Sequence, residues 1–333
     1  MAPERVRWGI IGVGDVTERK SGPAFQQAAS SELVAVMRRN GDLARSYAKR
    51  HGVPRWYDDA DALIADSGVD AVYIATPPDS HCDYVQRVAA AGKPVYVEKP
   101  MARTADECRA MIDACARVGV PLFVAYYRRA MPRFAAARNL IHSGRLGEVR
   151  SVLVRTQQPA AHLSDGLPWR LDPRCSGGGL FVDLGSHTLD WLDQVLGPIT
   201  GVAGRVSHPL AGHGSAETLV TASFTFESGV NGVGLWDFDA SERVDRIEFI
   251  GTEGSLALSS FGEEPLHLTR GGVTTQIPAP YPAVVQLPLV QRIVDVLSAR
   301  ERDPISTGES ALRTASVVDA VLADYRERHG ITF

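Results

Sequence analysis

The first 125 residues alternate between short apolar runs and amphipathic segments. Continuous apolar runs predict buried strands over 5–13, 31–37, 69–75, 94–97 and 121–125. Helical spacing, closed in most cases by a glycine, predicts helices over 42–50, 58–66, 79–91 and 104–118. Apolar strands separated by helices are typical of a parallel sheet covered on both faces. The pattern therefore predicts an α/β, doubly wound domain over residues 1–125.

After residue 125 the hydrophobic pattern changes to the alternation that half-buried strands require. Such runs predict strands over 149–156, 217–227, 230–238, 246–250 and 256–259. Ser228-Gly229 is a predicted hairpin turn between two of them. Helices are expected over 132–142, 288–299 and 309–329. Residues 126–333 are therefore predicted to form an α+β domain with a mostly antiparallel sheet.

Composition narrows the functional classes. A chain of 333 residues with 44% hydrophobic and 22% charged residues is expected to form two folded domains. The net charge is -4 and no run of lysine or arginine occurs, so neither nucleic acid nor a membrane surface is an expected partner. We expect no apolar leader and no membrane span. The four cysteines form no C-x-x-C pair, which predicts reduced thiols and a cytoplasmic location.

The turn after the first predicted strand contains Gly12-Val13-Gly14. Gly12 and Gly14 fit the first two glycines of the G-x-G-x-x-G pattern, which lets the chain turn tightly and brings N–H groups close to a pyrophosphate. Asp15 and Val16 continue the predicted dinucleotide contact. Thr17 replaces the third glycine, so we expect the helix and the strand to pack slightly further apart.

The end of the second predicted strand indicates which dinucleotide binds. An acidic residue there would hold the 2′-hydroxyl of NAD, but this strand ends in Arg38-Arg39-Asn40. Two guanidinium groups suit the 2′-phosphate of NADP, so NADP is predicted in preference to NAD. The alternative interpretation is a solvated basic turn.

Two more strand ends carry candidate residues. Glu98-Lys99-Pro100 follows a short apolar strand, and ligands of open parallel sheets bind at the carboxyl ends of the strands. Lys99 is therefore predicted at the rim of a binding crevice, the alternative being a solvated loop lysine. Thr76-Pro77 follows another strand, and His81 is expected in the first turn of the next helix, facing the nicotinamide position. An ordinary structural role is an equally open interpretation of His81.

A third candidate group lies in the second domain. A helix is predicted from the Gly177-Gly178-Gly179 run to residue 196, and Asp183 and His187 are spaced i, i+4 on one face of it. A solvated pair would give the same spacing. Gly185 inside this helix costs about 1 kcal/mol, which close approach to a flat ring would justify. Metal binding is not expected, because the chain has no H-E-x-x-H motif and His208 with His213 makes a poor ligand pair.

Taken together, these motifs resemble the glucose-fructose oxidoreductase / inositol dehydrogenase / rhizopine catabolism (Gfo/Idh/MocA) family. The resemblance covers essentially the whole chain and rests on Gly12-Val13-Gly14, Thr76-Pro77 with His81, Glu98-Lys99-Pro100, Tyr127 with Arg129, Trp169-Arg170, and Gly178-Gly179 leading to Asp183 and His187. It implies a Rossmann domain and an open-faced sheet domain that often mediates oligomerisation, here a homodimer or homotetramer. Hydride would pass between the nicotinamide and a carbinol or carbonyl carbon of a sugar or polyol.

The resemblance also implies residue roles. Lys99 would exchange a proton with the reacting oxygen, His187 would be the second acid/base group, and Asp183 would orient a hydroxyl or the imidazole. Glu98 would hold the nicotinamide ribose, and the peptide before Pro100 would be cis. Further contacts are implied with the cofactor for Trp169 and Arg170 and with the substrate for Tyr127 and Arg129.

Some alternatives remain open at this point. The chain is predicted to be an NADP-dependent sugar or polyol oxidoreductase, or a dihydrodiol or pentose dehydrogenase; a non-catalytic NAD(P)-binding regulator is the other class. Retention of Lys99 and His187, which should meet over one nicotinamide face, favours the enzyme. A cluster of Arg128, Arg129, Arg170 and Arg174 would favour an anionic or hydroxylated substrate, although pairing with Asp172 or Glu148 explains some of them equally well. Lys20 either reaches over the crevice or marks a helix kinked at Gly22-Pro23.

Overall fold

The computed structural model of the chain describes residues 4–160, 169–207 and 216–333. Two compact units are present. Unit 1 contains the residues up to Ala102, Asp106–Met131 and Pro282–Leu312, and unit 2 contains Arg103–Ala105, Pro132–Tyr281 and Arg313–Phe333. The predicted second domain ran without interruption from residue 126 to 333, whereas the segment Pro282–Leu312 packs with unit 1.

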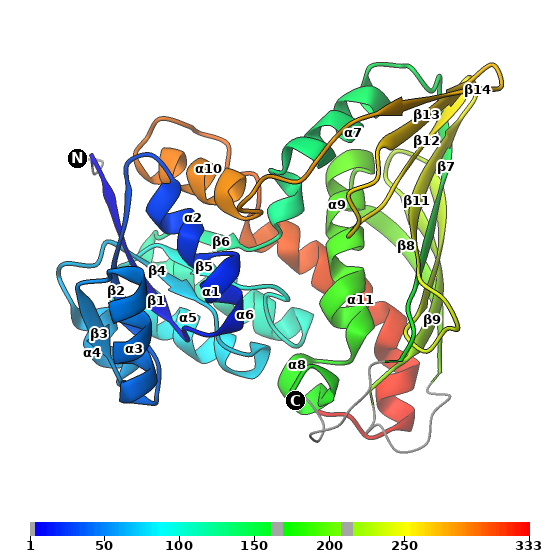
Figure 1. Cartoon of the computed structure of the whole chain (residues 1–333). Helices are drawn as coiled ribbons and strands as arrows, with labels where there is room; N and C mark the ends of the chain where they lie inside the picture. Colours follow the sequence, from blue (N-terminus) through cyan, green and yellow to red (C-terminus); the bar gives the residue numbers. More distant parts are fainter. Residues whose placement is uncertain (1–3, 161–168, 208–215) are drawn as a thin grey trace. The chain divides into compact units, whose positions relative to one another are not determined.

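Unit 1 is built on a six-stranded sheet with the order β3-β2-β1-β4-β5-β6 (Figure 1). The strands, all parallel, are β1 (Val6–Ile11), β2 (Ser31–Met37), β3 (Arg55–Tyr57), β4 (Ala71–Ile74), β5 (Val95–Val97) and β6 (Leu122–Val124). The helices are α1 (Asp15–Arg19), α2 (Gly22–Gln27), α3 (Gly41–His51), α4 (Ala60–Ala65), α5 (His81–Ala90), α6 (Ala105–Val118) and α10 (Leu287–Leu297). The strand order reverses between β1 and β4, which creates the switch point at which doubly wound folds bind ligands. The predicted Rossmann fold is confirmed.

Four aromatic rings form the centre of unit 1. Trp8, Phe25, Tyr73 and Tyr96 come from β1, α2, β4 and β5, and each is at most 1% exposed. The Phe25 ring lies 4.8 Å from Trp8 and 5.1 Å from Tyr73, and Tyr73 stacks on Tyr96 at 4.8 Å. Such rings bury large apolar areas, but a buried phenol also needs a polar partner. The two tyrosine hydroxyls therefore need acceptors inside this core, close to the end of β5.

Unit 2 contains an eight-stranded sheet with the order β14-β13-β12-β11-β7-β10-β9-β8. Its strands are β7 (Val149–Gln157), β8 (Ile199–Ser207), β9 (Leu219–Phe226), β10 (Asn231–Asp237), β11 (Val244–Gly251), β12 (Gly254–Leu258), β13 (Leu266–Arg270) and β14 (Val273–Ile277). Among the described strands of this sheet, only β7 and β10 pair in parallel, so the mostly antiparallel sheet is confirmed. The strands β8, β13 and β14 were not predicted, and the largely exposed β8 and β14 carry little apolar signal.

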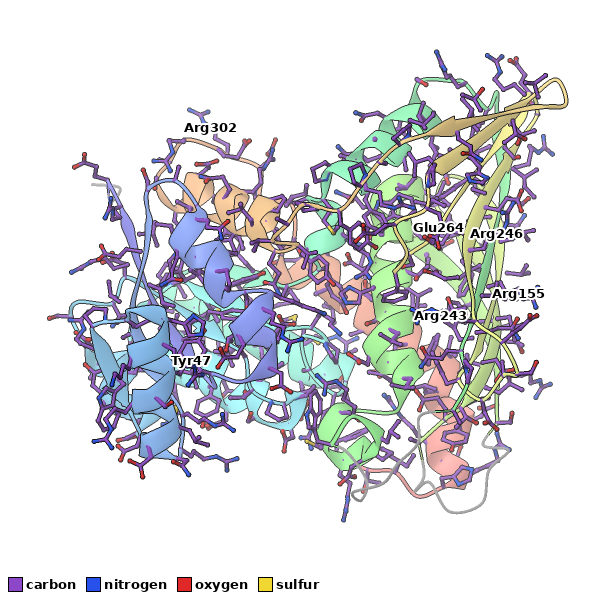
Figure 2. All side chains as sticks on the ribbon, viewed as in Figure 1. Tyr47, Arg155, Arg243, Arg246, Glu264 and Arg302 are labelled. Atoms are coloured by element: carbon purple, nitrogen blue, oxygen red, sulfur yellow. The ribbon has the colours of Figure 1, made fainter. Side chains whose placement is uncertain are left out.

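The two faces of this sheet differ. Helices α7 (Pro132–His142), α9 (Ser186–Leu196) and α11 (Gly308–Arg328) cover one face (Figure 1). On the other face, Leu153 and Val233 are 40% and 50% exposed. Arg155 and Arg246 are directly opposed in the β7–β11 register, and both project from the uncovered face (Figure 2). The sheet is thus open on one side, as the resemblance implied.

The helix predicted from the glycine run to residue 196 is present and runs without a break from Leu180 to Leu196. Its first part is a π-helical turn (Phe181–Gly185), which continues directly into α9 at Ser186, and a separate short helix α8 (Pro173–Ser176) precedes the glycine run. A Cβ atom on Gly185 would lie 2.7 Å from the Phe181 ring and 3.3 Å from Trp236 Nε1. The flat rings that justify this glycine are therefore the protein's own side chains. The π turn also means that ideal α-helical spacing does not describe the relation between Asp183 and His187.

No helix in the described part of the chain has the length and apolar character needed to cross a membrane.

Candidate active site

The glycine-rich turn has one glycine that the fold requires and one that it does not. Gly12 has φ +93°, and a Cβ atom there would lie 2.6 Å from Thr76 Cγ2. Gly14 is extended at φ -167°, and a Cβ atom on it would meet no atom within 4 Å. Packing therefore leaves open space beside Gly14. Asp15 and Val16 lie in the first turn of α1, where N–H groups lack intrahelical acceptors and suit a phosphate.

Thr17, at the third glycine position, closes this turn. Its buried Oγ1 accepts the Gly14 N–H at 2.9 Å and donates to the Gly14 carbonyl at 2.8 Å. The sequence prediction gave Thr17 only an effect on helix–strand spacing. In the structure the residue has a hydrogen-bonding role in the turn itself.

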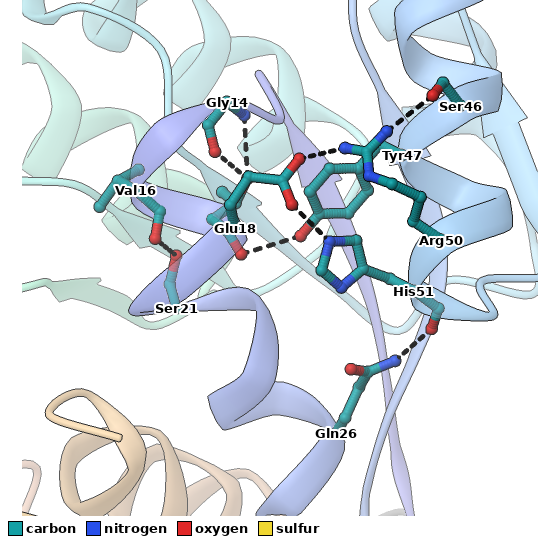
Figure 3. Close-up of polar contacts among 10 residues, drawn as sticks. Gly14, Val16, Glu18, Ser21, Gln26, Ser46, Tyr47, Arg50 and His51 are labelled. Atoms are coloured by element: carbon teal, nitrogen blue, oxygen red, sulfur yellow. Dashed lines mark hydrogen bonds and ion pairs between the residues drawn. The ribbon is translucent and has the colours of Figure 1, made fainter. Parts of the chain in front are cut away.

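Helix α1 is tied to α3 by a polar cluster (Figure 3). Glu18 pairs with Arg50 and accepts a contact from His51 Nε2 at 2.7 Å. Burial acts to raise the pKa of Glu18, but its bonds to His51 and Arg50 outweigh that and lower it. The Tyr47 hydroxyl donates to the Thr17 carbonyl at 2.9 Å, and burial raises the pKa of Tyr47 to about 12, so the phenol stays a donor. The glycine-rich turn therefore sits on a firmly held helix.

Lys20 is exposed and lies in the short link between α1 and α2. The kinked helix that the sequence suggested is two separate short helices, and Pro23 occupies the first turn of the second one.

Arg38 and Arg39 follow β2 directly and are both exposed. The next residue, Asn40, caps α3 by accepting the Leu43 N–H at 3.1 Å. Among the described residues, neither guanidinium group has a carboxylate partner. Both side chains therefore remain available to an anion at the end of β2.

Glu98 and Lys99 stand at the end of β5. The peptide between Lys99 and Pro100 is cis, as the resemblance implied. The Glu98 carboxylate is 7% exposed and accepts the Tyr73 hydroxyl at 2.5 Å and the Gln286 amide at 2.8 Å on Oε1. Its Oε2 accepts the Lys99 backbone N–H at 3.0 Å. These contacts hold Glu98 in place beside the half-buried Lys99 side chain.

His81 does not have the ligand-facing position that was expected. Its side chain is fully buried, with Nε2 at 2.7 Å from the Thr76 carbonyl and Nδ1 at 3.1 Å from the Met101 carbonyl. Burial lowers the pKa of His81, which favours the neutral ring. A neutral imidazole donates through one nitrogen only, and we assign Nε2 as the donor because its contact is the shorter one. The expected cofactor contact is corrected: the buried His81 ring packs between the Thr76-Pro77 turn and the loop after Lys99, and it donates its hydrogen bond to the Thr76 carbonyl.

Unit 2 carries a second group of candidate residues. Asp183 lies in the π-helical turn, and its Oδ2 is 3.5 Å from Arg170 Nε. The Arg170 guanidinium group lies over the Trp169 ring at 4.3 Å. The His187 side chain is 3% exposed, and its ring meets Phe261 edge to face at 6.2 Å. Asp183, Arg170 and Trp169 therefore form one connected group.

Two carboxylates that sequence reasoning missed support this region. Buried Glu217 accepts the Gly179 N–H at 2.7 Å, just before the π-helical turn, and burial raises the pKa of Glu217. Asp245 accepts the backbone N–H groups of Ser260 and Phe261 at 3.0 and 2.6 Å and thereby holds the Phe261 loop. Neither residue belongs to a local motif, so no sequence signal identified them.

The remaining candidates separate by unit. Tyr127 and Arg129 lie in a buried 3-10 turn of unit 1 (Tyr127–Arg129), where Arg128 lies 5.2 Å from the Tyr127 ring. In unit 2, Arg174 pairs with Asp172 at 3.2 Å, which agrees with the pairing alternative for that residue. Lys99 and His187 lie in different units, and their joint action stays a prediction. Within the described ranges no group of His, Cys, Asp or Glu is placed to hold a metal ion, and His208 and His213 fall outside these ranges.

Comparison with known proteins gives the family. The model described as "Oxidoreductase family, NAD-binding Rossmann fold" matches residues 6–126, and "GFO/IDH/MocA C-terminal domain" matches residues 134–257. The chain belongs to the Gfo/Idh/MocA family. It is accordingly an NAD(P)-dependent dehydrogenase or reductase, which favours the enzyme over the non-catalytic regulator.

Individual proteins are similar to this chain over three quarters of its length or more. "Oxidoreductase P35" of Formosa agariphila is 36% identical over 314 residues, covering 93% of this chain and 96% of that protein. The 1,5-anhydro-D-fructose reductase of Ensifer adhaerens is 31% identical, over 75% of this chain and 74% of that protein. A crystal structure of aldose-aldose oxidoreductase from Caulobacter crescentus with glycerol has a TM-score of 0.87 and 26% identity, covering 97% and 98% of the two chains.

Proposed function

We propose that this family member is an NADP-dependent oxidoreductase that acts on a carbinol or carbonyl carbon of a sugar, polyol or related small molecule. The observation that carries the proposal is the anchored Glu98 beside Lys99 at the end of β5. The substrate class is supported by relatives named 1,5-anhydro-D-fructose reductase and inositol 2-dehydrogenase.

The cofactor residues follow from the geometry of unit 1. The proposed pyrophosphate contacts are the backbone around Gly12, Gly14, Asp15 and Val16. Arg38 and Arg39 would bind the 2′-phosphate, since neither is neutralised by a carboxylate in the described structure. Thr76 and Pro77 would border the dinucleotide, and Glu98 would accept a hydroxyl of the nicotinamide ribose. Trp169 and Arg170 are proposed as further cofactor contacts, with Arg170 shared with Asp183.

The proposed chemistry has two side chains, Lys99 and His187, as acid/base groups. The bound nicotinamide supplies or accepts the hydride. In the direction of reduction, the Lys99 ammonium group would donate a hydrogen bond and then a proton to the carbonyl oxygen; in oxidation the neutral amine would take it back. His187 would serve the same reaction as the second acid/base group. Asp183, Tyr127 and Arg129 would orient the substrate hydroxyls.

A substrate panel tests the proposal. Purified protein is mixed with NADPH or NADH and with anhydro-ketoses, keto-inositols and simple keto-sugars, and the loss of reduced cofactor is followed by absorbance. The reverse assay uses NADP or NAD with polyols, pentoses and a dihydrodiol. The dihydrodiol and pentoses are included because relatives are named trans-1,2-dihydrobenzene-1,2-diol dehydrogenase and D-apiose dehydrogenase. We expect turnover with at least one sugar or polyol and a preference for NADP. Cofactor binding without turnover on any member would contradict the proposal.

The open sheet face supports a homo-oligomer. A shallow depression on this face is lined by Leu153, Val233 and their neighbours on β8, β9 and β10. We propose that a second copy covers it, giving a homodimer or a homotetramer. Val233→Asp should shift the sedimentation profile toward monomer, whereas Val273→Asp, on the exposed strand β14, should not. A wild-type monomer at all concentrations would contradict this assembly.

All four cysteines lie outside disulfide bonds, and Cys108 and Cys115 are buried on α6. Cysteines that form no disulfide support a reducing compartment, and we propose a cytoplasmic location.

A further inference from the structure

Gln286 is a fully buried glutamine at the start of α10, in the segment that packs with unit 1 after the sheet of unit 2. It occupies the N-cap position of α10, but its side chain makes no capping bond. Its amide instead bonds on both sides: Nε2 lies 2.8 Å from Glu98 Oε1, and Oε1 lies 3.0 Å from the Tyr96 hydroxyl. A buried amide is costly unless it is bonded in this way, so its position serves these two partners.

The direction of each hydrogen bond follows from the chemistry of the groups. Burial, followed by the neighbouring Glu98, raises the pKa of both Tyr73 and Tyr96 well above the usual value, so both phenols are protonated donors. A carboxylate only accepts, so Gln286 must turn its NH₂ group toward Glu98. Its carbonyl oxygen then accepts from Tyr96. The network therefore runs in one sense, from Tyr96 through Gln286 to Glu98, and each bond supports the next.

The two carboxylate oxygens of Glu98 have different hydrogen-bond partners. Oε1 takes the bonds from Tyr73 and Gln286, which fixes the plane of a carboxylate whose last torsion is otherwise soft. Oε2 accepts the backbone N–H of Lys99 at 3.0 Å and retains a further lone pair. Fixing Oε1 therefore determines where the free acceptor of Oε2 points.

We propose that Gln286 is a positioning residue for the cofactor: it holds Glu98 so that Oε2 accepts a hydroxyl of the nicotinamide ribose. The inference rests on the proposed function, in which Glu98 contacts that ribose. It adds a determinant of cofactor binding that lies 188 positions further along the chain than Glu98.

The test compares a whole dinucleotide with its adenosine half. Dissociation constants are measured by fluorescence or calorimetry for NADPH and for 2′,5′-ADP, which lacks the nicotinamide ribose; NADH and AMP are measured in parallel. Gln286→Met keeps the length of the side chain but removes both bonds. We expect it to weaken binding of the preferred dinucleotide about tenfold, the effect of one lost charge-assisted bond, and to leave the adenosine fragment unchanged.

Gln291→Met is the matched control on the same helix. Its amide oxygen accepts the Ala29 N–H at 2.7 Å, so it also holds α10 against unit 1 but lies on another contact. It should leave both dissociation constants at their wild-type values. Tyr96→Phe removes only the hydroxyl that orients the Gln286 amide and should weaken dinucleotide binding less than Gln286→Met does. This variant carries the test if Gln286→Met does not fold.

The possible failures are distinguishable through Glu98→Gln. If Glu98→Gln weakens dinucleotide binding selectively and the Gln286 and Tyr96 variants do not, the inference is overturned while the proposed function stands. Equal weakening of the dinucleotide and the fragment in Gln286→Met overturns it as well, because that pattern indicates a loss of packing. If Glu98→Gln has no effect, the ribose contact fails and the inference fails with it. A wild-type protein that binds no dinucleotide contradicts the proposed function itself.

Discussion

Thr17 Oγ1 bonds to both polar groups of the Gly14 backbone, accepting its N–H at 2.9 Å and donating to its carbonyl at 2.8 Å. A glycine or alanine at this position would bring helix and strand together but could not make these bonds. Because Gly14 is the N-cap of α1, the threonine acts from the third helical position back onto the cap. The departure from the glycine pattern thus replaces close packing with local hydrogen bonding at the proposed pyrophosphate contact.

This relationship predicts the effect of removing one hydroxyl group. Thr17→Val keeps the shape of the side chain but leaves the Gly14 N–H without its bond. We expect the free energy of unfolding to fall by about 1–2 kcal/mol and NADPH affinity to fall severalfold. Urea unfolding and cofactor titration measure the two effects. Thr17→Ser, which keeps the hydroxyl, should remain near wild type, and a Thr17→Val protein identical to wild type in both assays would contradict the role.

The preference between NADP and NAD should depend on the residues that follow β2. Arg39→Ala and Arg38→Ala should each lower the ratio of kcat/KM for NADPH over NADH by roughly 10- to 100-fold, the cost of a lost guanidinium–phosphate bond. The reason is that NADH carries no 2′-phosphate for either side chain to bind. Arg45→Ala is a suitable control, because Arg45 is 66% exposed on α3 and pairs with Asp42. If the control changes the ratio as much as the two variants do, the selectivity does not come from a specific contact.

Local patterns predicted most of the fold. Apolar runs identified five of the six strands of unit 1, and alternation identified five strands of unit 2. The strand β3 was missed because its residues, Arg55–Tyr57, form no buried apolar run, and β8 and β14 because none of their side chains is buried. Motifs that occupy consecutive positions, such as Glu98-Lys99-Pro100, could also be recognised from the sequence alone.

What could not be predicted depends on contacts between distant parts of the chain. Gln286 reaches Glu98 from 188 positions away, and Glu217 reaches Gly179 from 38 positions away. The π-helical turn at Phe181–Gly185 contains Gly185, where a Cβ atom would lie 3.3 Å from Nε1 of Trp236 on β10. His81 was placed near the right loop, but only the tertiary structure provides the carbonyl groups that surround its ring.

The proposed acid/base roles predict a separation of binding from turnover. Lys99→Met should lower kcat by about 10²- to 10⁴-fold, the usual contribution of one general acid, with the NADPH dissociation constant changed less than threefold. His187→Gln should lower kcat as well. The decrease should be smaller than in Lys99→Met if Lys99 alone transfers the proton in the rate-limiting step. Steady-state kinetics and cofactor titration on the same preparations test this. Full turnover in Lys99→Met would exclude the lysine as the acid.

The buried imidazole of His81 makes stability depend on pH in a defined direction. Burial lowers the folded-state pKa of His81 below the ordinary 6.5, so between these two values the unfolded chain binds more protons. Its contribution to stability is therefore present above pH 6.5 and is lost as the pH falls toward the folded-state pKa.

His81→Gln isolates this contribution, because the glutamine amide can still donate to the Thr76 carbonyl but does not titrate. The variant removes the proton linkage and keeps the hydrogen bond that ties the turn after β4 to α5. We expect the wild-type melting temperature to fall relative to that of His81→Gln as the pH is lowered from 7.5 to 5.5, and the difference to be constant above neutrality. Thermal unfolding of both proteins in a buffer series measures this difference. If the wild-type melting temperature does not change with pH relative to that of His81→Gln, or rises relative to it as the pH is lowered, the ring is not held neutral by its surroundings.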